Sequence, residues 1–138
     1  ALKSQADYGL FLPLQMASAA VLCSEQDLVR ETAATYGRRC EVAVGGLKEL
    51  GWDIEMPVSG ACLWGRLPTA WRGTTAPDET QAGKGADFCR RLLKDCAVAA
   101  LPGEEFGPTW EEYVRFALVV PEERIREMLS RLAAFRPG

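Results

Sequence analysis

One arginine of this sequence lies where a charged side chain is unusual. Arg115 occupies the middle of the stretch YVRFALVV at residues 113–120, and its neighbours on both sides are apolar. A guanidinium in such surroundings is suited to bind a carboxylate across a cleft, because its planar fork of N–H donors matches the two carboxylate oxygens. The alternative is an arginine on an edge strand whose guanidinium reaches the solvent. Under the first interpretation, Arg115 is the candidate binding residue.

The absence of histidine limits what chemistry the sequence can perform. Histidine bases, serine–histidine and cysteine–histidine nucleophile pairs, and histidine-containing metal sites are excluded. The five cysteines are widely spaced and form no C-x-x-C pair, so neither a disulfide framework nor a zinc site is expected. Cys23 and Cys62 stand next to apolar residues, and Cys23, Cys40 and Cys62 are all expected to be small buried side chains rather than redox groups. We expect no metal and a reducing, cytoplasmic environment.

Two further segments carry groups that can contact a ligand. The stretch LPGEEFG at residues 101–107 brackets Phe106 with Gly103 and Gly107, which allow backbone conformations that other residues avoid. This stretch is either a purely structural turn or a wall of the candidate cleft. Near the N-terminus, the hydroxyl of Ser4 lies beside a lysine in the sequence and is able to contact a phosphate.

The overall composition is that of a soluble globular domain. The chain has 138 residues and a mass of 15.1 kDa, with 48% hydrophobic and 25% charged residues. Its net charge of −3 and pI of about 5.1 disfavour a nucleic-acid-binding module, which is normally basic. No apolar run is long enough to span a membrane, and no signal peptide is recognised, so neither nucleic acid nor membrane is an expected partner.

The N-terminal part is predicted to form two helices. Residues 10–23 are rich in strong helix formers, and residues 25–50 form a longer periodic segment with Ser24 as its expected N-cap. Glycines at position 37 or at positions 45–46 are places where this second helix could bend. Its apolar face is expected to comprise Leu28, Tyr36, Val44, Leu47 and Leu50.

The rest of the sequence predicts a small sheet covered by helices. Strands are expected at residues 52–56, 61–67, 98–101 and 113–120, an exposed loop at 68–85, and helices at 87–96 and 121–135. This order of elements indicates an α+β fold with a small mixed sheet and a long N-terminal helix pair.

Several segments resemble the pyridoxal-phosphate aminotransferases of fold type I. Residues 2–15, LKSQADYGLFLPLQ, are similar to the segment L-K-S-N-x-D-S-G-x-F-x-P-x-Q of the alanine, aspartate and LL-diaminopimelate aminotransferases. Three further motifs come in the family's order. They are Y-x-x-R at residues 36–39, P-x-x-G-A-x-x-W at 57–64, and P-G-x-x-F-G followed by Y-V-R at 102–115. The resemblance covers essentially all 138 residues, and it is to the C-terminal small domain of such enzymes.

The resemblance implies a division of the chain and roles for two residues. Residues 1–9 would connect to a large domain that the sequence lacks, and residues 10–138 would be the small domain, helical over 10–50 and with sheet and helices over 51–138. Arg115 would bind the α-carboxylate of an amino acid or 2-oxo acid substrate. Ser4 would lie in the segment that reaches the cofactor phosphate of the neighbouring subunit in a homodimer.

The resemblance also implies a cofactor, pyridoxal 5′-phosphate, that the full-length enzyme binds. In the family, the lysine that attaches this cofactor belongs to the large domain, and Lys3 does not replace it. The chain alone is therefore expected to bind no cofactor and to be inactive, with no catalytic residue of its own. In the full-length enzyme, this domain would supply the carboxylate-binding arginine and close on the large domain.

A second interpretation is a non-catalytic, stand-alone binding or interaction module with the same fold. Such a module would present a polar surface where the large domain is missing. The first predicted helix is instead strongly apolar, and exposed apolar surface of this kind usually marks a missing partner. Its apolar residues are Leu10, Phe11, Leu12, Leu14 and Met16.

Overall fold

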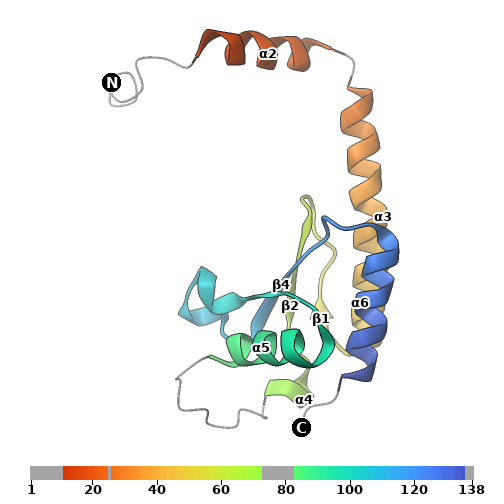
Figure 1. The fold of residues 1–138 in the computed structure, drawn as a ribbon, viewed down its shortest axis with the longest axis vertical. Coiled ribbons are helices and arrows are strands. Elements are labelled where there is room, and N and C mark those ends of the chain that lie inside the picture. Colours follow the sequence, from red (N-terminus) through yellow and green to blue (C-terminus); the bar gives the residue numbers. More distant parts are fainter. Residues whose placement is uncertain (1–10, 25, 73–82, 136–138) are drawn as a thin grey trace. The chain divides into compact units, whose positions relative to one another are not determined.

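The computed structural model describes residues 11–24, 26–72 and 83–135 (Figure 1). The chain divides into two units, Ala1–Ala34 and Thr35–Gly138, which are described separately. The second unit contains the sheet and the candidate site.

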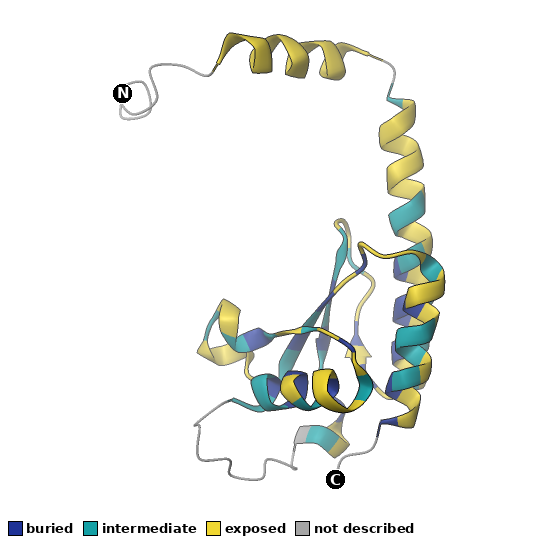
Figure 2. Cartoon of the chain, in the orientation of Figure 1, coloured by how far each residue is buried: buried dark blue, intermediate teal, exposed yellow. Residues whose placement is uncertain are grey.

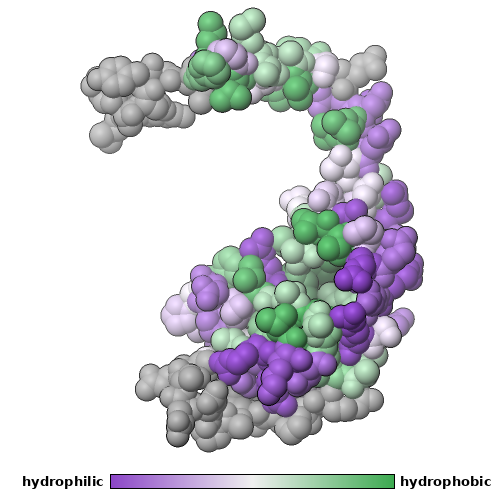
Figure 3. All heavy atoms as spheres, viewed as in Figure 1, coloured by the Kyte–Doolittle hydropathy of each residue, from purple (hydrophilic) through white to green (hydrophobic). Residues whose placement is uncertain are grey.

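The first unit contains an exposed apolar helix, α2 (Leu12–Cys23), close to the predicted bounds. Pro13 stands in its first turn, where no backbone N–H is needed. None of its residues is buried, and Figure 3 shows hydrophobic side chains over its surface. The exposed large apolar residues of this segment are Phe11, Leu12, Leu14, Met16, Val21 and Leu22.

Ser24 ends α2 rather than beginning the next helix, so its prediction as an N-cap was wrong. Its hydroxyl donates to the backbone carbonyl of Val21 at 2.8 Å and therefore satisfies a C-terminal carbonyl of α2. The following helix, α3, starts only at Asp27 and extends to Glu49.

Helix α3 (Asp27–Glu49) is buried only in its C-terminal half (Figure 2). Leu28, which the periodicity places on the buried face, is 75% exposed, because the apolar stripe meets the core only from Cys40 onward. The helix continues without interruption through its three glycines. Gly46 allows helix α6 (Glu122–Ala134) to approach, because a Cβ at this position would collide with the Leu129 side chain. The buried residues of α3 are Cys40, Ala43, Val44 and Leu47.

The second unit contains a four-stranded sheet in the order β1-β2-β4-β3. The strands are β1 (Asp53–Ile54), β2 (Cys62–Arg66), β4 (Tyr113–Ala117) and β3 (Leu101–Pro102). The α+β class and the small helix-covered sheet are confirmed, but each strand pair is antiparallel instead of belonging to the predicted mixed sheet.

The two faces of the sheet differ in burial, as the alternation in the sequence predicts. One face, with Leu63, Val114 and Phe116, is buried in a core shared with α3, α6 and helix α5 (Lys84–Cys96). The other face is only half-buried and carries Cys62, Trp64, Arg66, Tyr113 and Arg115. The charged and aromatic side chains of the sheet are therefore gathered on the more open face.

Several predicted bounds differ from the structure. A short helix, α4 (Thr69–Arg72), interrupts the predicted loop at 68–85, and residues 73–82 lie outside the described part of the chain. The strand predicted at 98–101 pairs only over Leu101–Pro102, because Val98 packs in the core without joining the ladder. Two 3₁₀ helices, η1 (Gly103–Phe106) and η2 (Pro108–Trp110), lead into β4.

The cysteines are not uniformly buried. Cys40 lies in the core as predicted, but Cys23 is exposed on α2 and Cys62 is half-buried. The expectation that these two side chains are buried was therefore wrong. Cys23 lies on a helix with no buried residue, and Cys62 lies on the open face of the sheet. Apolar neighbours in the sequence reveal neither position.

The buried thiol of Cys89 predicts a loss of stability at alkaline pH. Burial raises its pKa from 9.0 to about 12, and the Glu104 carboxylate contributes to the shift. The unfolded chain loses this proton above pH 9 while the folded chain retains it, so folding stability falls as pH rises from 9 towards 12. Between pH 8 and pH 10 we expect the free energy of unfolding to fall by about 1 kcal/mol more in the wild type than in Cys89→Ala, since burial also raises the pKa of the Cys40 and Cys96 thiols, which both proteins retain. Urea unfolding of both proteins at the two pH values measures it, and equal losses would contradict the assignment.

Candidate functional site

Arg115 lies on an inner strand of the sheet. Strand β4 pairs with β2 on one side and β3 on the other, and Arg115 is opposite Trp64 and Leu101 in the two ladders. The alternative of an arginine on an edge strand was therefore wrong. The side chain is half-buried on the open face.

The guanidinium of Arg115 is held by two neutral groups. Its Nη2 donates to the Sγ of Cys62 at 3.1 Å, and its Cζ lies 5.6 Å from the centroid of the Phe106 ring. Within the described residues, Arg115 has no carboxylate partner, whereas Arg66 on the same face pairs with Glu112 at 2.8 Å. A half-buried guanidinium with an uncompensated charge and further N–H donors is able to bind a carboxylate from outside these residues.

Phe106 belongs to a cluster of aromatic rings beside Arg115. Its ring meets the edge of Trp64 at 5.3 Å between centroids, and Trp64 stacks on Tyr113 at 5.7 Å. Trp110 contacts both Trp64 and Tyr113. The sequence left two interpretations for the segment 101–107. This segment does more than turn the chain, because it places the Phe106 ring beside the Arg115 guanidinium.

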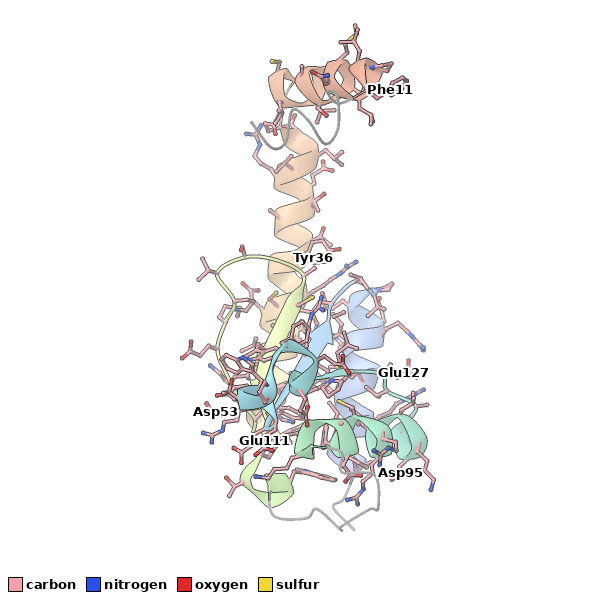
Figure 4. All side chains as sticks on the ribbon, turned by 90° about the vertical axis from the view of Figure 1, so that its left-hand side faces the viewer. Phe11, Tyr36, Asp53, Asp95, Glu111 and Glu127 are labelled. Carbon is pink, nitrogen blue, oxygen red and sulfur yellow. The ribbon has the colours of Figure 1, made fainter. Side chains whose placement is uncertain are left out.

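A groove of about 500 Å³ runs along this face of the sheet. Cys62, Trp64, Trp110 and Tyr113 line it, together with residues 55–58 and with Asp53, which is labelled in Figure 4. Asp53 and Glu55 bring two carboxyl groups to this lining. Cys62 is the link between the groove and Arg115, because it lines the first and accepts a hydrogen bond from the second.

The other charges near β4 satisfy one another. Glu112 accepts hydrogen bonds from Arg66 and from Lys84 Nζ at 3.0 Å, and these bonds hold the pKa of the Glu112 carboxyl below its ordinary value. The same hydrogen bond from Lys84 to Glu112 raises the pKa of the Lys84 ammonium, which stays protonated. Lys84 is therefore engaged in an ion-pair network and is not a free amine at neutral pH.

The described residues bring no cluster of metal ligands together and place no lysine beside Arg115. Besides Lys84, the lysines in these segments are Lys48 and Lys94, both exposed on helices, so the face with Arg115 carries no lysine from the described ranges. Over the same ranges, no group of three or more potential metal ligands comes together, and no helix has the length and apolarity needed to cross a membrane. Ser4, the predicted phosphate contact, and Lys3 lie outside the described residues, as does the connector 1–9.

A comparison with known protein families shows to which family this chain belongs. A family model described as aminotransferase class I and II matches residues 3–132. This chain belongs to the class I and II aminotransferases. The match includes Arg115 and the aromatic segment before it, and it confirms the family that the sequence motifs indicate.

Individual aminotransferases match nearly the whole chain. The glutamate-pyruvate aminotransferase AlaC of Escherichia coli is 38% identical over 134 residues, which are 96% of this chain and 30% of that protein. The LL-diaminopimelate aminotransferase of Gloeobacter violaceus is 30% identical over 132 residues, covering 96% of this chain and 31% of its own length. This chain therefore spans about 30% of the length of these curated relatives.

Solved structures of other proteins share the fold. The substrate-bound BacF structure from Bacillus subtilis has a TM-score of 0.74 at 27% identity, covering 94% of this chain and 30% of that one. An aromatic aminotransferase from Pyrococcus horikoshii has a TM-score of 0.73 at 27% identity, covering 87% of this chain and 30% of its own. Both agree with the α+β architecture described above.

Sequence reasoning missed the contact between Cys62 and Arg115 and the cluster of aromatic rings. Alternation along β2 places Cys62 and Trp64 on one face, and this signal is present in the sequence. The register that sets Trp64 opposite Arg115 is a pairing between residues 51 positions apart, and no local pattern specifies it.

Proposed function

We propose that this chain is the part of a pyridoxal-phosphate-dependent aminotransferase that binds the α-carboxylate of the substrate. The full-length protein would transfer an amino group from an amino acid to a 2-oxo acid. The observation that carries this proposal is the half-buried guanidinium of Arg115, which has neutral neighbours and no carboxylate partner among the described residues.

The contribution of Arg115 would be orientation as well as affinity. Two parallel N–H···O bonds to a carboxylate define both its position and its plane, and so restrict the directions in which the substrate Cα–H bond can point. Restricting a reactant to the productive orientation lowers the entropic part of the barrier. The cofactor supplies an electron sink for the carbanion chemistry at Cα when it is bound.

The cofactor would be held by residues outside the described part of the chain. The described lysines are exposed or paired with carboxylates, so attachment of pyridoxal phosphate falls to the full-length enzyme. Ser4 is our candidate for contact with the cofactor phosphate of the neighbouring subunit. A cytoplasmic homodimer, with closure of this domain on the large one, completes the proposal.

The exposed apolar surface of α2 supports the view that another part of the protein covers this helix. A helix with six exposed large apolar residues in and beside it is unfavourable in water, and burying this surface against another part of the protein would stabilise the assembly. We propose that the remainder of the full-length polypeptide covers α2. This surface disfavours the stand-alone module as a function.

An amino-transfer assay tests the proposal. The relatives named above act, by their names, on glutamate and pyruvate or on LL-diaminopimelate, so L-alanine with 2-oxoglutarate and LL-diaminopimelate with 2-oxoglutarate are the first pairs to try. We expect activity of the full-length protein that depends on pyridoxal phosphate, and none from the 138-residue chain. Amino transfer by the chain alone, or none by the full-length protein with any amino acid, would contradict the proposal.

A further inference from the structure

We propose that Cys62 is a positioning residue for Arg115. Its thiol would hold the guanidinium in the orientation that accepts a substrate carboxylate. This inference rests on the proposed function and adds a residue to that site.

The register of the sheet brings the two side chains together. Cys62 is paired with Ala117 and Trp64 with Arg115, so Cys62 is the diagonal neighbour of Arg115 on the same face. Diagonal neighbours on antiparallel strands are within reach of a long side chain. The Arg115 side chain spans this diagonal, and its Nη2 reaches the Cys62 Sγ at 3.1 Å.

Two elements then restrict the guanidinium from different sides. Strand β2 supplies the thiol, and η1 supplies the Phe106 ring, whose centroid is 5.6 Å from the Arg115 Cζ. One N–H is directed at sulfur, which leaves other donors of the planar group for a ligand. A guanidinium restricted in this way loses less conformational freedom when a carboxylate binds than one that samples several rotamers.

The chemistry of a thiol suits this role. Sulfur is a weak and neutral acceptor, so it orients the guanidinium without compensating its charge. A carboxylate at position 62 would neutralise Arg115 and compete with the substrate, and an apolar side chain would offer no acceptor. Cys62 also lines the groove, so its small side chain leaves space where the ligand would approach.

Three variants of the full-length enzyme test the inference. Cys62→Ala removes the acceptor, Cys62→Ser keeps a small acceptor, and Cys96→Ala is the matched control. Cys96 is also half-buried and its sulfur also has a polar contact, but with the backbone of Arg131 on α6.

We expect Cys62→Ala to raise the KM for L-alanine about 3- to 10-fold, the effect of losing one weak hydrogen bond to a charged group. The kcat should stay within about twofold, because Arg115 still makes both bonds to the carboxylate once the substrate is bound, so the thiol affects the binding step and not the orientation of the bound Cα–H bond. Cys62→Ser and Cys96→Ala should both stay within about twofold of the wild type. The dissociation constant of 2-aminoisobutyrate, which has the carboxylate but no Cα hydrogen, should rise in Cys62→Ala by the same factor as KM.

The outcomes separate this inference from the proposed function. An unchanged KM in Cys62→Ala, or equal losses in Cys62→Ala and Cys62→Ser, would overturn the positioning role, provided that Arg115→Ala raises KM. If Arg115→Ala leaves KM unchanged, the proposed carboxylate site itself fails. A fall in kcat at constant KM in Cys62→Ala would also overturn the inference, because it would place the thiol in the chemical step.

Discussion

Replacing Arg115 with alanine in the full-length enzyme is expected to raise the KM for the amino acid about 30- to 1,000-fold. A bidentate, charge-assisted contact contributes about 2–4 kcal/mol to binding, and each 1.4 kcal/mol corresponds to a factor of ten. Steady-state kinetics with L-alanine would measure the change. The affinity for pyridoxal phosphate should be unaffected, since Arg115 is proposed to contact the substrate carboxylate and not the cofactor.

Two further variants make this prediction specific. Arg115→Lys keeps the charge but loses the planar fork, so its KM should fall between those of the wild type and Arg115→Ala. Arg126→Ala removes an exposed arginine that pairs with Glu122 on α6, and it should leave KM unchanged. Equal losses of amino-acid and cofactor binding in Arg115→Ala would argue against a carboxylate role.

Replacing Gly103 with alanine is expected to destabilise the domain by about 3 kcal/mol, at the upper end for overpacking a buried site. Gly103 is buried at the start of η1, and a Cβ there would collide with the backbone oxygen of Trp110 and lie 2.8 Å from that of Tyr113. Backbone atoms of β4 and η2 cannot move aside as a flexible side chain can. Chemical denaturation of the two proteins would measure the difference in free energy of unfolding.

Gly37→Ala is the matched control for this prediction. Gly37 lies in the exposed part of α3, and a Cβ at this position would meet nothing within 4 Å. Alanine there should stabilise the protein by about 0.5–1 kcal/mol, because it restricts the unfolded chain and favours the helix. A similar response of both glycines would show that close packing does not explain the requirement at Gly103.

The sequence by itself determined the long helices, the approximate places of the strands and the family. A strand was predicted at residues 113–120, and its alternation separates the buried Val114 and Phe116 from Arg115, because successive side chains of a strand point to opposite faces. Helices α2, α5 and α6 lie within three residues of their predicted bounds, since caps, prolines and apolar periodicity are local signals. The motifs around Arg115 indicated the aminotransferase family, which the family match confirms.

Only the tertiary structure decided what surrounds Arg115. The antiparallel order β1-β2-β4-β3 makes β4 an inner strand, and its register with β2 brings Cys62 to the guanidinium. Burial of Cys23 and Leu28 was likewise mispredicted, because an apolar residue is buried only where another element covers it. Strand pairing and helix docking join residues far apart in the chain, so local periodicity can tell which face of an element is apolar but not which side chain it will meet.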